Sequence, residues 1–165
     1  MIKKFPKILF VCNGNIFRSF SAEVLLQKYL RENKIRNWKI QSAGIYADPK
    51  VKVFPEILEN LKKLGAKSLK HRPHKINKIT LKKFDLVICM AKNQIDFLKE
   101  NFDYKKAKLF NDVALNKKTS IWDIDDMVKN WKTNKKAVDK YTFKTIKYIN
   151  DNIPKLVKNM IKKYD

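Results

Sequence analysis

Glycine, cysteine and histidine are all scarce in this sequence. Its 165 residues include only three glycines, two cysteines and two histidines. Two cysteines cannot build a disulfide scaffold, which points to a reducing compartment and leads us to expect a cytoplasmic protein. The longest early apolar run, residues 8–12, is far too short for a membrane span or a signal-peptide core, so we expect no membrane association.

Acidic residues are also few, with 16 Asp and Glu against 38 Lys and Arg and a formal net charge of +22. Such an excess raises the possibility of nucleic-acid binding, because phosphate backbones attract cations without sequence preference. Only four of the 38 are arginines, however, and abundant Lys, Asn and Ile together are what A/T-rich coding produces. We therefore interpret the charge as a solvated lysine surface and do not expect a nucleic-acid partner.

The chain contains no repeat, low-complexity tract or linker, and its length suits one domain covering residues 1–165. Apolar runs typical of buried parallel strands alternate with helical patterns. The alternation predicts an α/β fold, a three-layer arrangement of a parallel sheet with helices on both faces and ligands beyond the carboxyl ends of the strands. The expected strands are 7–12, 38–42, 85–90 and 107–110, and the expected helices are 19–33, 54–64, 93–101 and 134–151, with Pro154 breaking the last helix and starting another.

The turn after the first predicted strand has the residues that phosphate chemistry requires. Cys12 and Arg18 enclose five residues at a point where a strand passes into a helix. Backbone N–H groups in such a turn, together with the helix N-terminus, bind anions, and Gly14 would allow the tight curl. The expected phosphate-binding residues are Asn13, Gly14, Asn15, Ile16, Phe17 and Arg18.

The same turn also holds a candidate nucleophile. Arg18 can bind two phosphate oxygens and stabilise charge as the transition state forms. Positive surroundings favour the thiolate form of Cys12, and a thiolate beneath a bound phosphate is a nucleophile for phosphoryl transfer. Ser19 is placed to donate a hydrogen bond to that sulfur. The spacing therefore predicts a cysteine-dependent phosphomonoester hydrolase.

The segment VCNGNIFRSFSAE resembles the signature V-C-x-G-N-x-C-R-S-P-x-A-E of the low-molecular-weight protein tyrosine phosphatases, whose loop the related arsenate reductases share. Further landmarks of the family follow in order: Ser42-Ala43-Gly44, Asp48-Pro49, His71 and the strand FDLVICM. The resemblance implies a four-stranded sheet and hydrolysis of phosphotyrosine in proteins through a phosphocysteine, with no metal and no cofactor. Its implied ligands are phosphorylated proteins, small aryl phosphates, inorganic phosphate and other oxyanions. It also implies that Asn15, Ser42 and His71 hydrogen-bond to one another and hold the shape of the loop, with Ser19 as a further supporting residue beside the sulfur.

The family resemblance further implies an Asp that acts as general acid on a loop before the last helix. The corresponding segment here is IWDIDDM, residues 121–127, which offers three carboxylates. Alignment on Trp122 and Ile124 assigns the acid to Asp126, and a slip of one residue would assign it to Asp125 instead. Neighbouring carboxylates raise one another's pKa, which suits a group that must be protonated.

Several positions depart from the family pattern. Phe17 stands where many members have a second cysteine, and the aromatic residues that would wall an aryl ring are not obvious, with Tyr46 and Trp131 as candidates. Two alternatives to a tyrosine phosphatase stay open. One is an arsenate reductase, although Cys89 is the only other thiol that could relay electrons. The other is a basic protein that binds polyanions without catalysis.

Overall fold

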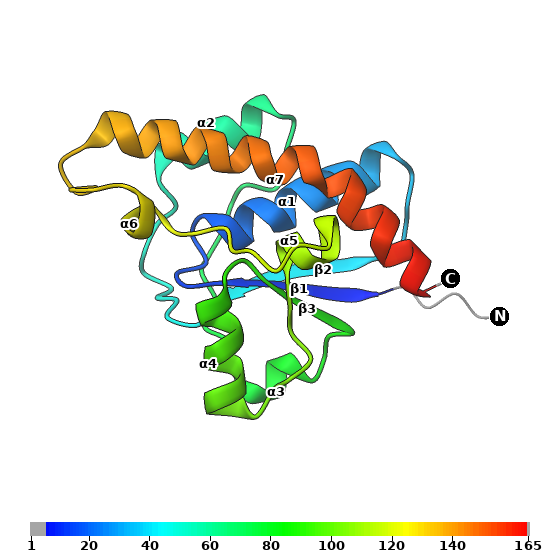
Figure 1. Ribbon diagram of the computed structural model, residues 1–165. Helices are drawn as coiled ribbons and strands as arrows, with labels where there is room; N and C mark the ends of the chain where they lie inside the picture. The colour runs from blue at the N-terminus through cyan, green and yellow to red at the C-terminus, as the bar shows by residue number, and fades with distance from the viewer. Residues whose placement is uncertain (1–5, 165) are drawn as a thin grey trace.

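The computed structural model describes residues 6–164 and contains a sheet of four parallel strands (Figure 1). The strands are β1 (Lys7–Cys12), β2 (Lys39–Gly44), β3 (Leu86–Cys89) and β4 (Lys108–Leu109), in the spatial order β2-β1-β3-β4. All three pairings are parallel, and Cys12 at the end of β1 pairs with Gly44 at the end of β2. The predicted four-stranded α/β architecture is confirmed.

Helices cover both faces of the sheet (Figure 1). One layer contains α1 (Arg18–Glu32), α2 (Pro55–Lys63), α5 (Phe110–Leu115) and α7 (Lys135–Tyr164), and the other contains α3 (Lys78–Leu81) and α4 (Lys92–Phe102). The short helix α6 (Ile124–Met127) packs against α7. In the described part of the chain, no helix combines the length and the apolar character needed to cross a membrane.

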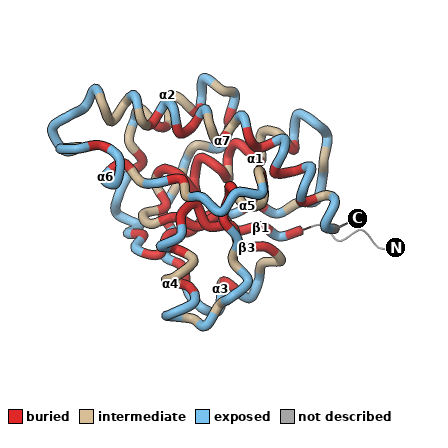
Figure 2. The backbone as a smooth tube through the Cα atoms, in the orientation of Figure 1, coloured by how far each residue is buried: buried red, intermediate tan, exposed pale blue. Residues whose placement is uncertain are grey.

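The strands divide the core into two parts because successive side chains of a strand point to opposite faces. On β1, Phe10 and Cys12 belong to the core beneath α1 and α7, whereas Val11 belongs to the core on the α3 and α4 side. Cys89 of β3 lies beside Val11 in the second core. Buried residues follow the strands and the inner faces of the helices (Figure 2). The two cysteines therefore face opposite sides of the sheet.

The first strand has the predicted bounds, and the other predicted strands and helices, apart from the end of the last helix, overlap the observed ones with shifts of one or two residues at their ends. The prediction that Pro154 breaks the last helix is wrong, because α7 continues through it as one helix of 30 residues. Pro154 lies on the exposed face of α7, where water can satisfy the carbonyl that loses its hydrogen bond. Ile153 and Leu156 on either side are buried, and their packing keeps the helix intact.

Candidate active site

The sulfur of Cys12 sits inside the loop that joins β1 to α1. Cys12 is only 2% exposed, and its Sγ lies 2.9 Å from the hydroxyl of Ser19. The backbone N–H of Asn15 donates to the same sulfur at 3.3 Å. The Ser19 hydroxyl and the Asn15 N–H are therefore both able to donate a hydrogen bond to the sulfur.

Asn15 is the residue around which the loop is built. Its φ of 57° lies in the left-handed region, which Asn tolerates better than most residues. Its side-chain amide donates to Ser19 at 2.9 Å and to Ser42 at 2.8 Å, while its Oδ1 accepts from the backbone N–H of His74 at 2.9 Å. Asn15 and Ser42, which the family resemblance joins, are thus connected with Ser19 in one network.

The expectation that Gly14 provides the freedom for the curl is wrong. Gly14 does not have a positive φ, and a Cβ there would meet only an ordinary contact of 3.6 Å. The glycine that the loop requires is Gly44, where a Cβ would lie 2.5 Å from the carbonyl oxygen of Asn13. The end of β2 presses directly against the loop, and only glycine leaves room for this approach.

His71 supports the loop from outside. Its Nε2 donates to the carbonyl oxygen of Asn15 at 2.6 Å, and its ring stacks on Phe20 at a centroid distance of 4.1 Å. Burial lowers the pKa of His71 more than the bond to Asn15 raises it, and nearby His74 lowers it further. The neutral ring that results still has one N–H, which the Asn15 carbonyl uses.

Three residues that the sequence did not single out, Glu23, Asn93 and Gln94, also support the loop or its network. Ser42 donates to Oε1 of Glu23 at 2.5 Å, and burial raises the pKa of Glu23 although that hydrogen bond opposes the shift. Asn93 and Gln94, at the start of α4, both donate to Oδ1 of Asn13 at 2.8 Å. Glu23 could have been noticed as a charged residue on the inner face of α1. Asn93 and Gln94 could not, because only the tertiary fold brings α4 to the loop.

Arg18 is buried, with 1% exposure, at the first position of α1. Its Nη1 donates to the carbonyl oxygen of Ile121 at 2.8 Å. Its Nη2 lies 3.1 Å from Oδ2 of Asp123, close enough for an ion pair but without the alignment of a hydrogen bond. Nε has no hydrogen-bond partner among the described residues. The guanidinium is therefore held from one side and keeps donors for an anion.

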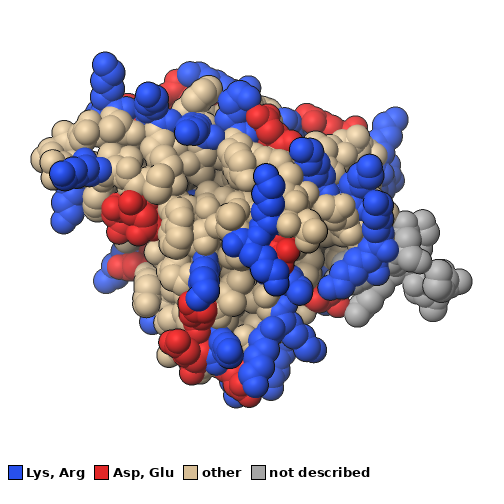
Figure 3. Space-filling view, viewed as in Figure 1, with Lys and Arg blue, Asp and Glu red and all other residues tan. Residues whose placement is uncertain are grey.

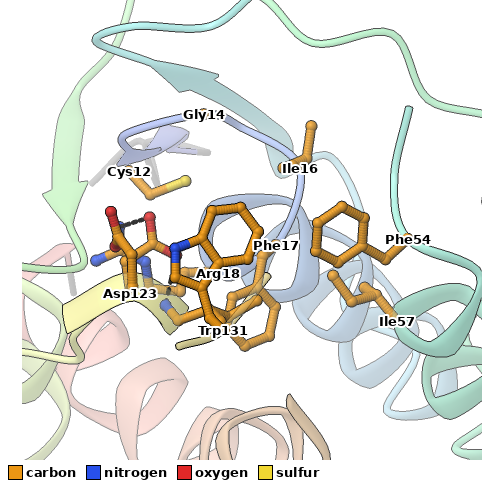
Figure 4. Close-up of a pocket in the computed structure, with 11 residues that line it drawn as sticks. Cys12, Gly14, Ile16, Phe17, Arg18, Phe54, Ile57, Asp123 and Trp131 are labelled. Atoms are coloured by element: carbon orange, nitrogen blue, oxygen red, sulfur yellow. Dashed lines mark hydrogen bonds and ion pairs between the residues drawn. The ribbon is translucent and has the colours of Figure 1, made fainter. Parts of the chain in front are cut away.

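A pocket opens beside these groups, and Figure 4 shows its side chains. Cys12, Arg18 and Asp123 lie toward one end of the view, and apolar side chains lie toward the other. The lining residues are Cys12, Gly14, Ile16, Phe17 and Arg18 from the loop, Phe54 and Ile57 from the α2 region, and Asp123, Ile124, Asp125 and Trp131 from the segment around α6. The pocket thus combines an anion site with an apolar wall.

The three carboxylates of the α6 segment occupy different places. Asp123 and Asp125 line the pocket, whereas Asp126 does not. Oδ2 of Asp126 instead accepts the backbone N–H of Asp123 at 3.1 Å, because residues 124–127 form a helical turn that directs its third residue back to the cap. The sequence alignment that selected Asp126 did not anticipate this turn.

Asp125 has a raised pKa, chiefly through burial and then through the neighbouring charges of Asp123 and Asp126. Figure 3 shows a patch of acidic atoms over α6, with other acidic and basic side chains elsewhere on the same face. Asp123 is the least exposed of the three, at 26%, and the only one of them paired with Arg18. The carboxylate nearest the anion site is therefore Asp123.

Tyr46 and Trp131, the two residues proposed from the sequence as walls for an aryl ring, lie in different places. Trp131 lines the pocket, but Tyr46 is 64% exposed and packs edge-on against Phe97 at a centroid distance of 5.5 Å. Phe54, which the sequence did not suggest, lies across the pocket from the Arg18 side (Figure 4). Trp131 and Phe54 are therefore the aromatic side chains available to a ring-bearing ligand.

Cys89 cannot reach the loop sulfur directly, since it faces the opposite side of the sheet. Burial raises the pKa of its thiol strongly, and the charge of Cys12 adds to the shift. Cys89 therefore resembles an inert core residue more than a relay thiol. Among residues 6–164, no group of three or more His, Cys, Asp and Glu side chains is arranged to hold a metal ion.

The family model of the low molecular weight phosphotyrosine protein phosphatases matches residues 7–165 of this sequence. The chain belongs to this family. It is 32% identical over 108 residues to a low molecular weight protein-tyrosine-phosphatase from Acinetobacter johnsonii, covering 65% of this chain and 72% of that protein. It is also 31% identical over 103 residues to a protein-arginine-phosphatase from Bacillus subtilis, covering 62% of this chain and 67% of that protein.

Solved structures agree on the fold of this phosphatase. The YwlE arginine phosphatase, in a mutant form with a phosphorylated active-site serine, gives a TM-score of 0.81 at 22% identity, covering 94% of this chain and 96% of that one. A low molecular weight protein tyrosine phosphatase from T. tengcongensis gives 0.77 at 26% identity, covering 93% and 98%. Wzb from Escherichia coli K30, solved with sulphate, gives 0.74 at 22% identity, covering 98% and 100%.

Proposed function

We propose that this phosphatase cleaves phosphomonoesters in two steps through a phosphocysteine. Sγ of Cys12 attacks phosphorus, the bond from phosphorus to the leaving oxygen breaks, and an acid protonates that oxygen. A water molecule then attacks phosphorus and gives its proton to the same carboxylate, the S–P bond breaks, and the thiolate and inorganic phosphate are released. The observation that carries the proposal is the position of the Cys12 sulfur, which contacts the Ser19 hydroxyl and the Asn15 N–H and lines the same pocket as Arg18.

The acid in this proposal is Asp126, the carboxylate that the family resemblance assigns. It lies on the short helix α6, next to the segment from which Asp123, Ile124 and Asp125 line the pocket. Asp123 lies 3.1 Å from Arg18, the group expected to hold the phosphate, and its backbone N–H donates to Oδ2 of Asp126 at 3.1 Å. Asp125 lines the pocket but is exposed, and it is the alternative acid if the alignment slips by one residue.

Phosphotyrosine in proteins is the proposed substrate class. The side chains of Ile16, Phe54, Ile57 and Trp131 give the pocket an apolar lining, which suits the flat aryl ring of phosphotyrosine better than the polar side chain of phosphoarginine. Of the two named relatives, one is a tyrosine phosphatase and one is an arginine phosphatase, so the choice of substrate class rests on the side chains that line the pocket. A reducing cytoplasm would keep Cys12 as a thiol, and we propose that compartment.

The test is hydrolysis of para-nitrophenyl phosphate with and without vanadate, followed by acid trapping of the phosphoenzyme. Cys12→Ser should abolish turnover because the thiolate is lost, whereas Cys89→Ala, a change to the other buried cysteine, should retain it. Turnover by Cys12→Ser equal to that of the wild type would refute the proposal.

The substrate class is tested on matched peptides that carry phosphotyrosine or phosphoarginine. The apolar wall predicts at least about tenfold higher kcat/KM on the phosphotyrosine peptide. Equal rates on the two peptides, or a preference for phosphoarginine, would contradict the assignment of the aryl substrate.

A further inference from the structure

A second pocket lies away from the phosphate loop, between helices α2 and α7, which pack against each other (Figure 1). We call it the α2–α7 groove. Its lining includes Leu64, just after α2, and Phe143 and Ile146 of α7, together with Lys63 and Lys147. Lysine stems are hydrocarbon, so the two lysines add apolar surface while their charged ends stay in water. The groove therefore presents an apolar surface with a basic edge.

Phe143 is the most exposed apolar side chain of this groove, with 57% of its surface accessible, whereas its neighbour Ile146 is only 1% exposed. A single exposed apolar residue is common on protein surfaces and carries no message by itself. Phe143 differs because it lines a concave surface together with Leu64 and Ile146. An apolar side chain placed in the groove would remove the Phe143 ring from water.

Lysines stand beside Phe143 on the exposed side of α7. Lys140 and Lys147 are three residues before it and four residues after it, so they share its face of the helix, and Lys144 follows it directly. Lys147 and Lys63 each pair with a carboxylate of their own helix, at 2.8 Å and 3.4 Å. Within residues 6–164, Lys140 and Lys144 form no ion pair. The groove therefore retains positive charge that a partner's carboxylates can neutralise.

The groove and the active-site pocket lie along the same helix. Ile57 of α2 lines the pocket that holds Cys12, and Leu64, seven residues further on, lines the groove. At about 1.5 Å per residue this is roughly 10 Å along the helix axis. An extended peptide advances about 3.3–3.6 Å per residue, so about three to five residues span the interval. One substrate chain can therefore occupy both places at once.

We propose that the α2–α7 groove binds a segment of the phosphorylated substrate protein in which an apolar side chain is flanked by carboxylates. This inference rests on the proposed function and adds to it the chemistry of the chain around the phosphorylated residue. The apolar side chain covers Phe143, and the carboxylates meet Lys140 and Lys144. The groove does not touch the reacting atoms, so its contribution is to KM and not to kcat.

The first test compares phosphotyrosine peptides that differ only outside the phosphorylated residue. The full peptide carries a spacer of about four residues and then a leucine between two aspartates, placed after the phosphotyrosine in one set and before it in another. In one set, KM should be about tenfold lower for the full peptide than for a version with alanine in place of the leucine, with kcat unchanged. Shortening the spacer to one residue should remove the advantage. Equal KM values for all peptides in both sets would overturn the inference.

Phe143→Ala tests the groove itself. It should raise KM on the full peptide about tenfold and leave hydrolysis of para-nitrophenyl phosphate unchanged. Ile79→Ala is the matched control, because Ile79 is an exposed apolar residue, 74% accessible, on α3 in the other helical layer. The same KM on the full peptide in both variants would contradict a docking role for the groove.

The charge of the groove is tested by a double variant, Lys140→Gln with Lys144→Gln. It should raise KM on the full peptide about threefold at low salt, and the difference should vanish near about 1 M salt because exposed charges are then screened. Lys155→Gln with Lys158→Gln, an equal loss of charge further along α7, should change KM little. Equal effects of the two double variants would mean that only the overall charge matters and would refute docking at this place.

Fluorescence anisotropy with the Cys12→Ser protein separates docking from catalysis, since it measures binding of the labelled full peptide without turnover. Weaker binding when Phe143→Ala is added supports the groove even if hydrolysis proves not to depend on Cys12. Unchanged binding removes the groove and leaves the phosphocysteine mechanism in place. Self-association in sedimentation that Phe143→Ala abolishes would assign the groove to a second copy of the chain and would also overturn the inference.

Discussion

The two halves of the site are built differently. The phosphate loop lies within one short stretch of chain, residues 12–19, and a buried hydrogen-bond network around Asn15 holds it. The acid segment around α6 is held by side chains from distant elements: Arg18 on α1 contacts Ile121 and Asp123, and Tyr141 on α7 donates to the carbonyl of Trp122. The comparison teaches that the loop's own residues are contiguous in sequence and are braced by Ser42, Gly44 and His71, whereas the placement of the acid segment depends chiefly on how α1 and α7 pack.

The largest expected effect comes from Arg18, the one side chain that belongs to both halves. Arg18→Lys keeps a positive charge but loses the planar fork and the contact with the carbonyl of Ile121. We expect kcat/KM on para-nitrophenyl phosphate to fall about 10³-fold. Arg31→Lys, the same change at the other end of α1, should leave the activity near wild type. A loss below tenfold in Arg18→Lys would mean that the loop amides alone hold the phosphate.

Asp126→Asn should have the next largest effect. Asn can still accept the N–H of Asp123 and so preserve the cap of α6, but it cannot deliver a proton. Hydrolysis of phenyl phosphate should slow about 10²-fold, measured as kcat under saturating substrate. Asp125→Asn is the matched control, since this neighbouring carboxylate lines the pocket. A greater loss in Asp125→Asn would move the acid by one residue and break the assignment.

The smallest effect concerns His71 and the pH dependence of folding. Because burial lowers the pKa of His71 from its ordinary value of 6.5, the unfolded chain binds the proton more readily than the folded one. The stability contribution is present above 6.5 and is lost as the pH falls through the lowered folded value. Urea unfolding of wild type and His71→Asn from about pH 7.5 to about pH 5.5 measures it.

His71→Asn should lose less free energy of unfolding than the wild type over that interval. The difference should be below about 1 kcal/mol, since the ring is only half-buried and solvent screens it. The comparison is one of slopes, because the variant also loses the bond to the Asn15 carbonyl at every pH. A steeper fall in the variant would contradict the direction of the pKa shift.

The sequence predicted the parallel sheet, the bounds of β1 and the loop from Cys12 to Arg18, because strand, turn and helix patterns there are all local. It misjudged Pro154, where tertiary packing of α7 outweighs the loss of one hydrogen bond. It also attributed the curl to Gly14, although the steric demand at Gly44 comes from a strand that lies beside the loop only in the folded state.

What the sequence by itself determined about this protein is the loop from Cys12 to Arg18 and the family, because the residues of that loop are contiguous and their types and spacing are visible in one short segment. Only the tertiary structure decided which carboxylate faces Arg18, because Asp123, Asp125 and Asp126 are adjacent in sequence and indistinguishable in type. The helical turn of α6 and the Tyr141 hydroxyl separate them, directing Asp123 into the pocket and Asp126 back to the cap. The physical reason is that a side chain's direction depends on backbone angles that contacts from distant helices fix.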